Sequence, residues 1–479
     1  MTEASQATTE VVDFVTGISF DDFPVHAVQL AKRCIIDGLA VVLAGSTTPG
    51  SKILRAHIMD NSSRPEATVL GASAFRTCAA SAALLNGASG HAMDFDDTQL
   101  STTPDRMFGL LTHPTVPPLA AALALGERRG ASGRALIEAF VTGFEVECKI
   151  AEAIDPIHYT KGFHSSGTIG TFGAAAAAAK LLKLNRAAVA HAIGMATSFC
   201  AGIRVNFGTM TKPLHVGRAA SNGVIAAELA ARGFTAGAEA LDGPWGFFQI
   251  FGGGFDAARI IGLLGKPFAI VQPGVAIKPY PCGCLGHPSM DAMLKLVVNH
   301  DVAPNQIRRI RLRAGSNILN PLRYKIAATE LEAKFCPAFM LASIALRRKA
   351  GIHEFTDEFV GSGPVQEMMR RVETVFDPAI EAQGFESMRS IVEVELEDGR
   401  HLVQAADERY RGGPDLPFSD QELHEKFLEC GELVLSSEAL HAAVKCLGTL
   451  ETVTHLSELV QLLSAPTPRD FELTSRLEV

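Results

Sequence analysis

The sequence predicts a mainly α-helical protein in which a smaller α+β domain is inserted into a large helical domain. Three observations lead to this fold class. Apolar residues recur at helical spacing as far as residue 268. Strand-like alternation is concentrated in a later stretch that proline and glycine residues punctuate. Helical periodicity then returns near the C-terminus, which predicts that the last helices rejoin the first domain.

The helical domain is predicted to begin with residues 1–268. Its helices are expected in segments such as HAVQLAKRCIIDGLAVVLAG, SGRALIEAFVTGFEVECKIAEAI and SNGVIAAELAARG, whose apolar residues fall on one helix face. The many alanine and glycine residues suit closely packed helices. Gly45 and Gly233 stand at predicted helix ends, and we expect them to serve as C-caps.

The α+β domain is predicted to span residues 269–412. IRRIRLRAG alternates as a strand does, and PAFMLASIALRRKAG has helical spacing. SIVEVELEDGRHLVQA predicts a hairpin, because Asp398-Gly399 is a strong two-residue turn signal between alternating runs. After the turn-rich RGGPDLPFS, residues 413–479 return to helical periodicity and are assigned to the helical domain.

The composition narrows the class of protein. The 479 residues carry 43 basic and 52 acidic side chains, a net charge of −9, and no basic stripe, so nucleic acid is not expected as a partner. No apolar run is long enough to cross a bilayer, so no membrane association is expected. The polar N-terminus lacks the features of a signal peptide. Nine scattered cysteines suit free thiols in a reducing compartment, which predicts a cytoplasmic protein.

The densest polar cluster is GHAMDFDDT at residues 90–98, where an Ala-rich helical run ends. A histidine and three acids in this segment are hard to bury for packing alone. The functional interpretations are a carboxylate base, a metal site or a helix-end network, and the structural one is an acidic N-cap cluster. Neither EF-hand spacing nor a second acidic motif accompanies the cluster, so no metal is expected.

Two histidines lie in short polar segments before predicted helices. His113 is in LLTHPT, and His164 is in KGFHSSGTIG, a Gly- and Ser-rich loop that opens an Ala-rich helix. Such a loop offers backbone N–H groups and a positive helix end to an anion. A single histidine in a loop is also commonly a structural residue.

Two lysines each precede a proline, which holds the backbone extended. Lys212 is in GTMTKPLHVGRAA and Lys278 is in AIKPYPCGCLGHP. Basic side chains on such rigid turns suit substrate carboxylates, whereas the structural interpretation is two ordinary surface lysines. The sequence has no Gly-x-Ser-x-Gly motif and no cysteine that spacing pairs with a base, which leaves acid–base chemistry.

In this order, the segments resemble the MmgE/PrpD family over nearly the whole chain. The resemblance rests on HAMDFDDT, THPTVPPLAAALALGE, the His164 loop with GTFGAAAAAAKLL, TKPLHVGRAA and KPYPCGCLGHPSMDA, with further agreement in EAKFCPAFMLA and HEKF. Members of this family include 2-methylcitrate dehydratase, cis-aconitate decarboxylase and iminodisuccinate epimerase. The resemblance implies a helical domain that holds both chain ends, a smaller α+β lid domain and a homodimer. The hydrophobic content of 47% also suits an interface between subunits.

The resemblance also implies the site residues. Six side chains match the decarboxylase pattern of the family: Asp94, Thr98, His113, His164, Lys212 and Lys278. The histidines are expected to move protons, with the aspartate and Lys212 as their catalytic neighbours, because an imidazole titrates near neutral pH. Thr98 and Lys278 are expected to bind the substrate.

Two further residues are assigned to substrate binding. Arg106, in a stretch between two site motifs that is longer than in the decarboxylase, is expected to clamp a carboxylate. His287 lies inside the last matched motif. The chain departs from the decarboxylase pattern at Phe339, where an aromatic hydroxyl is expected, and at Gly283, where a histidine is expected. Both departures speak against decarboxylation.

The resemblance therefore implies a cofactor-independent lyase, a hydro-lyase or a decarboxylase, that acts by acid–base chemistry on a small di- or tricarboxylate related to citrate or aconitate. Removal of a proton or CO₂ beside a carboxylate builds negative charge, which nearby cations stabilise most in the transition state. The alternative is an epimerase or isomerase of a dicarboxylate such as iminodisuccinate. A non-catalytic helical binding protein is a third interpretation, and the complete set of charged residues speaks against it.

Overall fold

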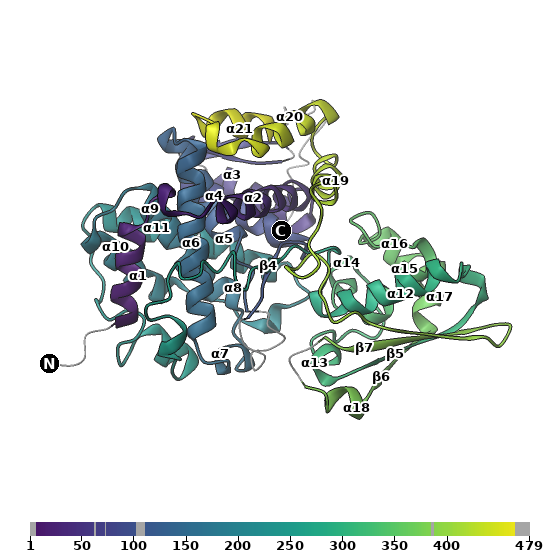
Figure 1. Cartoon of the computed structure of the whole chain (residues 1–479). Coiled ribbons are helices and arrows are strands. Elements are labelled where there is room, and N and C mark those ends of the chain that lie inside the picture. The colour runs from purple at the N-terminus through teal and green to yellow at the C-terminus, as the bar shows by residue number, and fades with distance from the viewer. Residues whose placement is uncertain (1–5, 62–63, 72, 102–110, 385–387, 465–479) are drawn as a thin grey trace.

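Most of the described chain is helical, as the sequence predicts (Figure 1). The structure is a computed structural model that describes residues 6–61, 64–71, 73–101, 111–384 and 388–464. Within these ranges no helix combines the length and the apolar character that a membrane span requires.

The helical part contains most of the chain before residue 232. Its helices are α1 (Gln6–Gly17), α2 (Val25–Gly45), α3 (Pro49–Asp60), α4 (Ala79–Ala92), α5 (Val116–Arg129), α6 (Gly133–Ala153), α7 (Ile157–Thr160), α8 (Ser165–Thr168), α9 (Gly170–Leu181), α10 (Arg186–Phe199) and α11 (Thr211–Ala231). Two short antiparallel pairs accompany them: β1 (Ala67–Val69) with β2 (Phe75–Thr77), and β3 (Thr98–Gln99) with β4 (Val275–Ala276). The predicted helices around residues 26–45, 132–154 and 221–233 are confirmed by α2, α6 and α11.

Glycine contacts bring α4 and α11 unusually close together. A Cβ atom on Gly87 of α4 would lie 3.0 Å from the Cα of Gly217, and one on Gly217 of α11 would lie 2.3 Å from the carbonyl oxygen of Leu84. Side chains at either position would push the helices apart. The close crossing places the N-terminal end of α11 beside the C-terminal end of α4, where the polar segment 93–98 begins.

Of the two glycines expected as helix caps, Gly233 follows α11 with a φ of 87°, the left-handed conformation that a C-cap uses. The expectation for Gly45 is wrong. Gly45 is the last residue of α2, and a Cβ atom there would lie 1.8 Å from the carbonyl oxygen of Ser89 on α4. The glycine is needed because two helices touch at this point, which the local sequence cannot show.

The later part of the chain forms a four-stranded sheet with helices packed on it (Figure 1). Its elements are α12 (His287–Asn299), β5 (Ile307–Ala314), α13 (Ser316–Leu319), α14 (Glu330–Ala333), α15 (Pro337–Arg347), α16 (Asp357–Gly361), α17 (Gly363–Arg370), β6 (Val372–Phe376), α18 (Pro378–Glu381), β7 (Ser390–Leu396) and β8 (His401–Ala405). The strand order is β6-β5-β7-β8, with β5 parallel to β6 and antiparallel to β7.

The predicted strand and hairpin are confirmed. β7 alternates buried and half-buried residues, and it pairs antiparallel with β8 across the turn that contains Gly399. α12 and α15 pack against this sheet and complete a separate hydrophobic core. The domain boundaries, and the action of this part as a lid, remain predictions.

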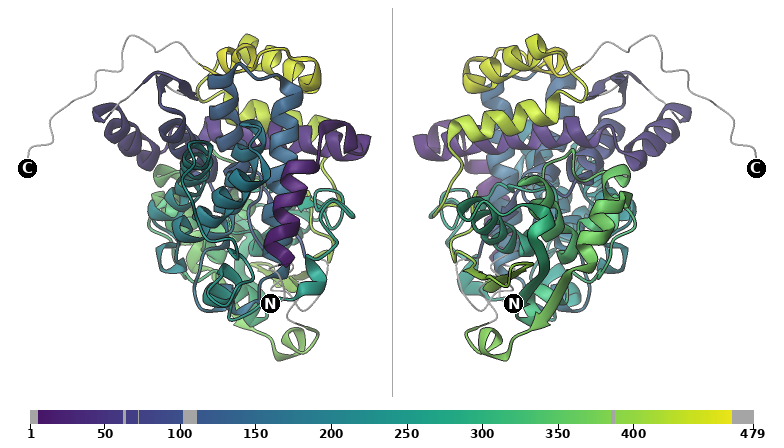
Figure 2. Two further views of the ribbon diagram at one scale, coloured as in Figure 1. Left: turned by 90° about the vertical axis from the view of Figure 1, so that its left-hand side faces the viewer. Right: turned by 90° about the vertical axis from the view of Figure 1, so that its right-hand side faces the viewer.

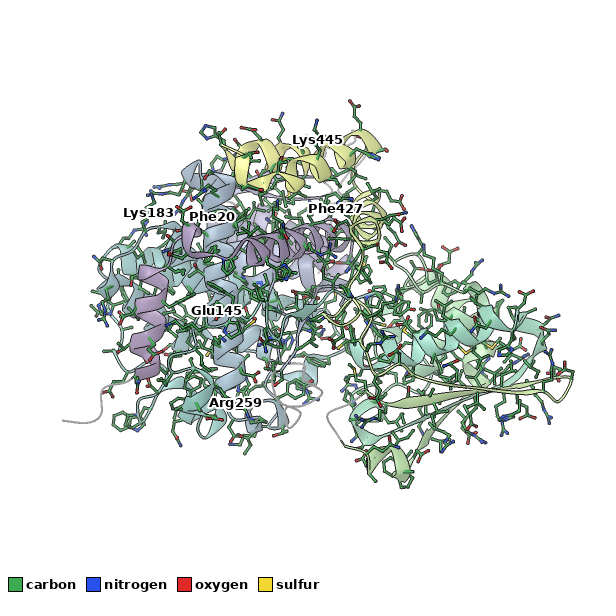
Figure 3. All side chains as sticks on the ribbon, in the orientation of Figure 1. Phe20, Glu145, Lys183, Arg259, Phe427 and Lys445 are labelled. Atoms are coloured by element: carbon green, nitrogen blue, oxygen red, sulfur yellow. The ribbon has the colours of Figure 1, made fainter. Side chains whose placement is uncertain are left out.

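The C-terminal helices α19 (Asp420–Gly431), α20 (Ser437–Gly448) and α21 (Leu456–Leu462) pack back on the first part of the chain (Figure 2). α19 lies against α2, and Phe427 of α19 is fully buried there (Figure 3). Beside it, the Nζ atom of Lys426 lies 2.6 Å from the carboxylate of Asp37, and both side chains are buried. The last helices are therefore part of the helical core.

This buried ion pair gives a test of that packing. We expect Lys426→Ala to lower the free energy of unfolding by about 3–5 kcal/mol, because the Asp37 carboxylate would stay buried without its cation. The matched control is Lys445→Ala on α20, where the lysine is exposed and a change below about 0.5 kcal/mol is expected. Urea denaturation of both variants measures the difference. Equal stabilities would contradict a structural role for the pair.

Candidate active site

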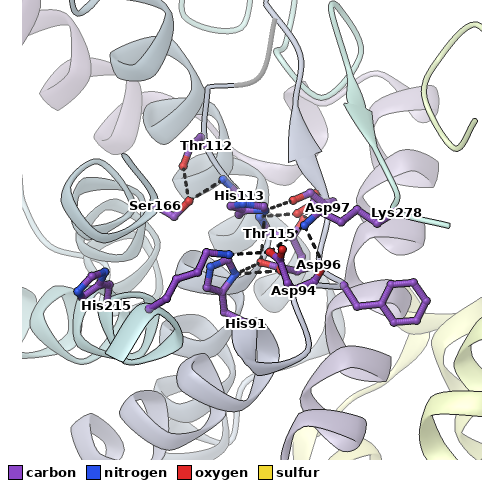
Figure 4. A network of polar contacts seen from close by, with 12 residues as sticks. His91, Asp94, Asp96, Asp97, Thr112, His113, Thr115, Ser166, His215 and Lys278 are labelled. Carbon is purple, nitrogen blue, oxygen red and sulfur yellow. Dashed lines mark hydrogen bonds and ion pairs between the residues drawn. The ribbon is translucent and has the colours of Figure 1, made fainter. Parts of the chain in front are cut away.

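A buried carboxylate shared by two lysines forms the centre of the site (Figure 4). Asp94 follows the C-terminal end of α4 and has a φ of 53°, a left-handed conformation that aspartate tolerates better than most residues. Its Oδ1 atom lies 2.6 Å from Nζ of Lys212 and 3.0 Å from Nζ of Lys278. Lys278 also donates to the backbone carbonyl oxygen of Asp94, at 2.9 Å.

Lys212 and Lys278 come from two separate parts of the fold. Lys212 lies in the first turn of α11, next to the close crossing with α4. Lys278 follows β4, whose pairing with β3 sets Ala276 opposite Thr98. Lys426 then fixes the backbone from behind, because its Nζ atom donates to the carbonyl oxygens of Phe95 and Lys278 at 2.9 and 3.0 Å.

Asp94 contributes one negative charge and contacts two lysine ammonium groups. Burial disfavours the ionised form of Asp94, but the two ammonium groups outweigh burial and lower its pKa well below the ordinary value. Burial also disfavours charge on Lys278, yet Asp94 raises the pKa of Lys278. Burial lowers the pKa of Lys212, and repulsion from Lys278 acts in the same direction. One carboxylate thus faces two cationic groups, which leaves positive charge for an anionic ligand.

His113 presents a neutral imidazole at this centre. Its Nδ1 atom lies 2.6 Å from the carbonyl oxygen of Asp97, and a carbonyl only accepts, so Nδ1 carries the hydrogen. Burial lowers the pKa of His113 to about 3 despite the attraction of Asp96. At neutral pH its Nε2 atom therefore has a free electron pair and can act as a base. The backbone N–H of His113 donates to Oγ of Ser166 at 3.0 Å, which fixes the loop.

His164 lies directly before α8, and the residue is 3% exposed. Its Nδ1 atom is 3.0 Å from Nδ1 of His215, a residue of α11. None of the described residues forms a hydrogen bond with its buried Nε2 atom. Burial, followed by the charges of His91 and Lys212, lowers the pKa of His164 well below the usual value. His164 is therefore also neutral at physiological pH.

His91 lies between these two imidazoles. Its ring stacks on that of His164, with centroids 5.5 Å apart, and meets the ring of His113 edge-on at 4.7 Å. Its Nδ1 atom is 2.7 Å from a carboxylate oxygen of Asp96 (Figure 4). Burial opposes ionisation of Asp96, but attraction to the two histidines lowers the pKa of Asp96 below the ordinary value. The His91–Asp96 pair thus supports the rings of both histidines from behind.

One cavity between the helical part and the sheet-containing part is lined by Asp94, the two lysines, His113 and His164. It has a volume of about 700 Å³ when its mouth, which is open to solvent, is included. Apolar side chains make up much of its wall: Leu111, Phe207, Leu285, Pro321, Leu322 and Phe335. Because an apolar wall lowers the local dielectric constant, the few charged groups act strongly on a ligand.

The structure brings together most of the residues that the sequence singles out. Six of them line the cavity: Asp94, Thr98, His113, His164, Lys212 and Lys278. Gly283 lines it as well. Asp94 and Lys278, which are in direct contact, are 184 residues apart in the chain.

Three other expectations have different outcomes. Arg106 lies outside the described residues. His287 is not among the residues that line the cavity, because its ring points to Tyr410 and to the carbonyl oxygen of Cys282, at 2.6 and 3.2 Å. Phe339 is fully buried in α15 against Phe355 and so lies in the core of the sheet-containing part. The identity of residue 339 therefore carries no information about the substrate.

Comparison with known proteins agrees with this arrangement. Residues 9–260 match the MmgE/PrpD N-terminal domain, and residues 280–449 match the MmgE/PrpD C-terminal domain. The chain belongs to the MmgE/PrpD family. It is 29% identical to human cis-aconitate decarboxylase over 464 residues, which cover 95% of this chain and 94% of the human one.

Other relatives carry the same name. The mouse cis-aconitate decarboxylase is 28% identical over 97% of this chain and 94% of its own length. A cis-aconitate decarboxylase of Aspergillus terreus is 24% identical, and 96% of each chain is covered. The chain therefore spans nearly the full length of these family members.

Sequence reasoning missed several side chains of this MmgE/PrpD site. Tyr159 lines the cavity, and the guanidinium of Arg204 lies 3.9 Å from the centre of its ring. Ser166 and Cys284 line it too. Tyr159 and Cys284 lie in segments without helical or strand periodicity, so only the fold shows that they face a ligand. Ser166 belongs to the Gly- and Ser-rich loop of His164, in which the sequence pattern points only to the backbone N–H groups.

One group of side chains has the composition of a metal site. His91, Asp96 and His113 each place a donor atom within 4.8 Å of the others. Both histidines, however, already use Nδ1, one toward the Asp96 carboxylate and the other toward the Asp97 carbonyl oxygen. The three acids of the 90–98 segment do not converge either, because Asp94 binds lysines and Asp97 binds Thr115. The two Nδ1 hydrogen bonds hold the rings of His91 and His113 in place, an arrangement that also occurs behind metal-bound histidines.

The buried Asp97 makes stability depend on pH. Burial raises the pKa of Asp97 to about 8 from 3.8, despite hydrogen bonds from Thr115. Folding thus favours the protonated form. The stabilisation from this group is complete below pH 3.8 and is lost as the pH rises through about 8.

We therefore expect the wild type to lose stability between about pH 6 and about pH 8, by at most about 1.4 kcal/mol per pH unit from this group. Asp97→Asn keeps an acceptor for the Thr115 hydroxyl group and removes the titration, so its stability should fall less. Denaturation midpoints of both proteins across this range measure the effect. Parallel pH profiles would contradict the assignment.

Proposed function

We propose that the protein is a cofactor-independent lyase that acts by acid–base chemistry on a small di- or tricarboxylate related to citrate or aconitate. The observation that carries this proposal is the shared contact of Asp94 with Lys212 and Lys278 in an apolar-walled cavity. This group is more cationic than anionic, and two neutral imidazoles stand beside it. A substrate with several carboxylates supplies the missing negative charge.

Binding follows from the unequal charges. A substrate carboxylate that approaches the lysines competes with Asp94 for the same ammonium hydrogens. It also relieves the repulsion between Lys212 and Lys278. The two Nζ atoms lie 2.6 and 3.0 Å from one oxygen of Asp94, so a single carboxylate can contact both. The apolar wall excludes water and orients the carbon skeleton.

Among lyase reactions we favour decarboxylation, because the human, mouse and Aspergillus relatives are named cis-aconitate decarboxylases. Of the two departures that speak against this reaction, Phe339 is buried away from the cavity and Gly283 alone lines it. In such a step the bond from carbon to one carboxylate breaks and CO₂ leaves. The electron pair stays on the substrate and spreads into a neighbouring unsaturated carboxylate, which the lysines stabilise. An imidazole N–H then delivers one proton to carbon. Each turnover consumes one proton from solvent.

The empty site keeps its imidazoles neutral, and substrate changes that state. Burial is the main reason that the pKa values of His113 and His164 are low, and the charge of Lys212 lowers both further. A bound polycarboxylate reverses the local charge, and nearby negative charge raises the pKa of an imidazole. We expect the proton donor to become charged only when an anionic substrate is present.

Proton NMR in D₂O with citrate, 2-methylcitrate, cis-aconitate and iminodisuccinate tests the reaction type. We expect CO₂ loss with deuterium incorporation from one unsaturated acid. His113→Ala and His164→Ala should each lower the rate by at least about 10²-fold, since each removes a proton carrier. His441→Ala, which changes an exposed histidine, is the matched control. Loss of water, or deuterium exchange without loss of CO₂, would instead identify a hydro-lyase or an epimerase.

The charge argument has its own test. Lys278→Met keeps a long side chain but removes a cation from the cavity, so we expect kcat/KM to fall by about 10²–10³-fold. Lys325→Met removes an exposed lysine and is expected to leave kcat/KM unchanged. Steady-state kinetics on the acid identified by NMR measures both. A Lys278→Met enzyme with full activity would exclude this lysine from substrate binding.

A further inference from the structure

His164 and His215 form a direct imidazole pair at the edge of the cavity. Their Nδ1 atoms are 3.0 Å apart, and their ring centroids are 5.2 Å apart. One of two Nδ1 atoms at this distance must donate to the other, so the two rings share a hydrogen. His164 lines the cavity, whereas His215 is not among the lining residues. The ring of His215 is therefore not placed to contact a ligand in the cavity.

Exposure increases along this pair. His164 is buried, and His215 is half-buried. His215 lies beneath the segment 201–209, in which Ala201, Ile203 and Val205 are exposed. The pair thus runs from the lining of the cavity to a half-buried ring.

Two glycines make room for the outer ring. A Cβ atom on Gly202 would lie 3.1 Å from Cγ and 3.2 Å from Nδ1 of His215. One on Gly167 would lie 2.9 Å from the Cβ atom of the same histidine. Gly202 has a φ of 141°, and its carbonyl oxygen accepts the backbone N–H of His164 at 3.0 Å. The same glycine therefore fixes both rings in contact.

We infer that His215 conducts protons between His164 and bulk solvent, an inference that rests on the proposed lyase function. A decarboxylation consumes one proton per turnover, so the buried donor must be reloaded from water. His164 faces the cavity on one side and His215 on the other, and imidazole can accept a proton on one nitrogen while it releases one from the other.

The relay balances its protons. Before the reaction His164 carries its hydrogen on Nε2 and His215 carries the shared hydrogen on Nδ1. With an anionic substrate bound, His215 takes one proton from water at Nε2 and passes the shared hydrogen to Nδ1 of His164, which then gives its Nε2 proton to the substrate carbon. The net change is one proton moved from solvent to substrate, and both rings end neutral in the opposite tautomer. Each ring returns to its first tautomer by exchanging N–H hydrogens with water, which moves no net proton. A reaction that removes a proton from carbon runs the same steps in reverse.

The Nδ1 atoms of His113 and His91 have no titratable, partly exposed partner within the described part of the chain. Nδ1 of His113 donates to the Asp97 carbonyl oxygen, which cannot pass a proton on. Nδ1 of His91 contacts Asp96, whose carboxylate is fully buried. His215 differs from both of these partners because it is titratable and half-buried.

The first test is His215→Gln, which keeps a hydrogen-bonding side chain next to His164 but cannot relay a proton. In dilute buffer without imidazole we expect kcat to fall by at least about tenfold with KM unchanged, a loss within the range of general acid–base effects. Added imidazole should restore kcat in a saturable manner, and sodium chloride of equal ionic strength should not. His441→Gln is the control. An unchanged kcat, or a loss that imidazole does not relieve, would overturn the relay.

The second test does not depend on turnover. In protein with ¹⁵N-labelled histidine, transfer of saturation from water reports how fast the hydrogen shared by His164 and His215 exchanges. We expect it to exchange faster than the Nδ1 hydrogen of buried His91, and to slow severalfold in His215→Gln. Equal exchange in both proteins would overturn the relay. If none of the acids reacts but this difference is present, the proposed substrate class is wrong while the proton path stands.

Discussion

The shared contact of Asp94 with two buried lysines is the interaction on which the rest of the site depends. A buried carboxylate or a buried ammonium group alone is strongly disfavoured, so each of the three residues requires the other two. The fold satisfies this requirement from several directions. The glycine contact between α4 and α11 brings Lys212 to Asp94, and the β3–β4 pairing brings Lys278. The polar centre therefore depends on the packing of the helices that carry its residues.

The same interaction explains why His113 and His164 are neutral in the empty cavity. Positive charge and an apolar wall both disfavour an imidazolium ion, so the empty cavity holds the rings as weak bases. An anionic ligand changes the sign of this environment and makes protonation favourable. In the proposed function, the binding of an anionic substrate and the protonation of the histidines are thus coupled by charge, without any required movement of the backbone. The His91–Asp96 pair keeps the rings in place in both states.

Sequence patterns predicted the elements well and the site only through resemblance. Periodicity identified helices such as α2 and α6 and the β7–β8 hairpin, because these depend on local spacing. Taken alone, Lys212 and Lys278 resembled surface lysines, since their burial arises from contacts between distant segments. His287 shows the converse. It belongs to a matched motif, yet the direction of its ring is set by Tyr410, 123 residues further along the chain. Motif membership does not determine where a side chain points.

The position of Lys426 has a consequence for biosynthesis. Its ammonium group holds the backbone carbonyl of Phe95, 331 positions earlier in the chain, and that of Lys278. Domains form from the N-terminal end as a chain is synthesised, and long-range contacts form late. A ribosome-bound chain that lacks α19 has both cavity-lining histidines but no support behind the loop that carries Asp94. The enzyme would thus gain its charged centre only near the end of translation, after the last helices have docked.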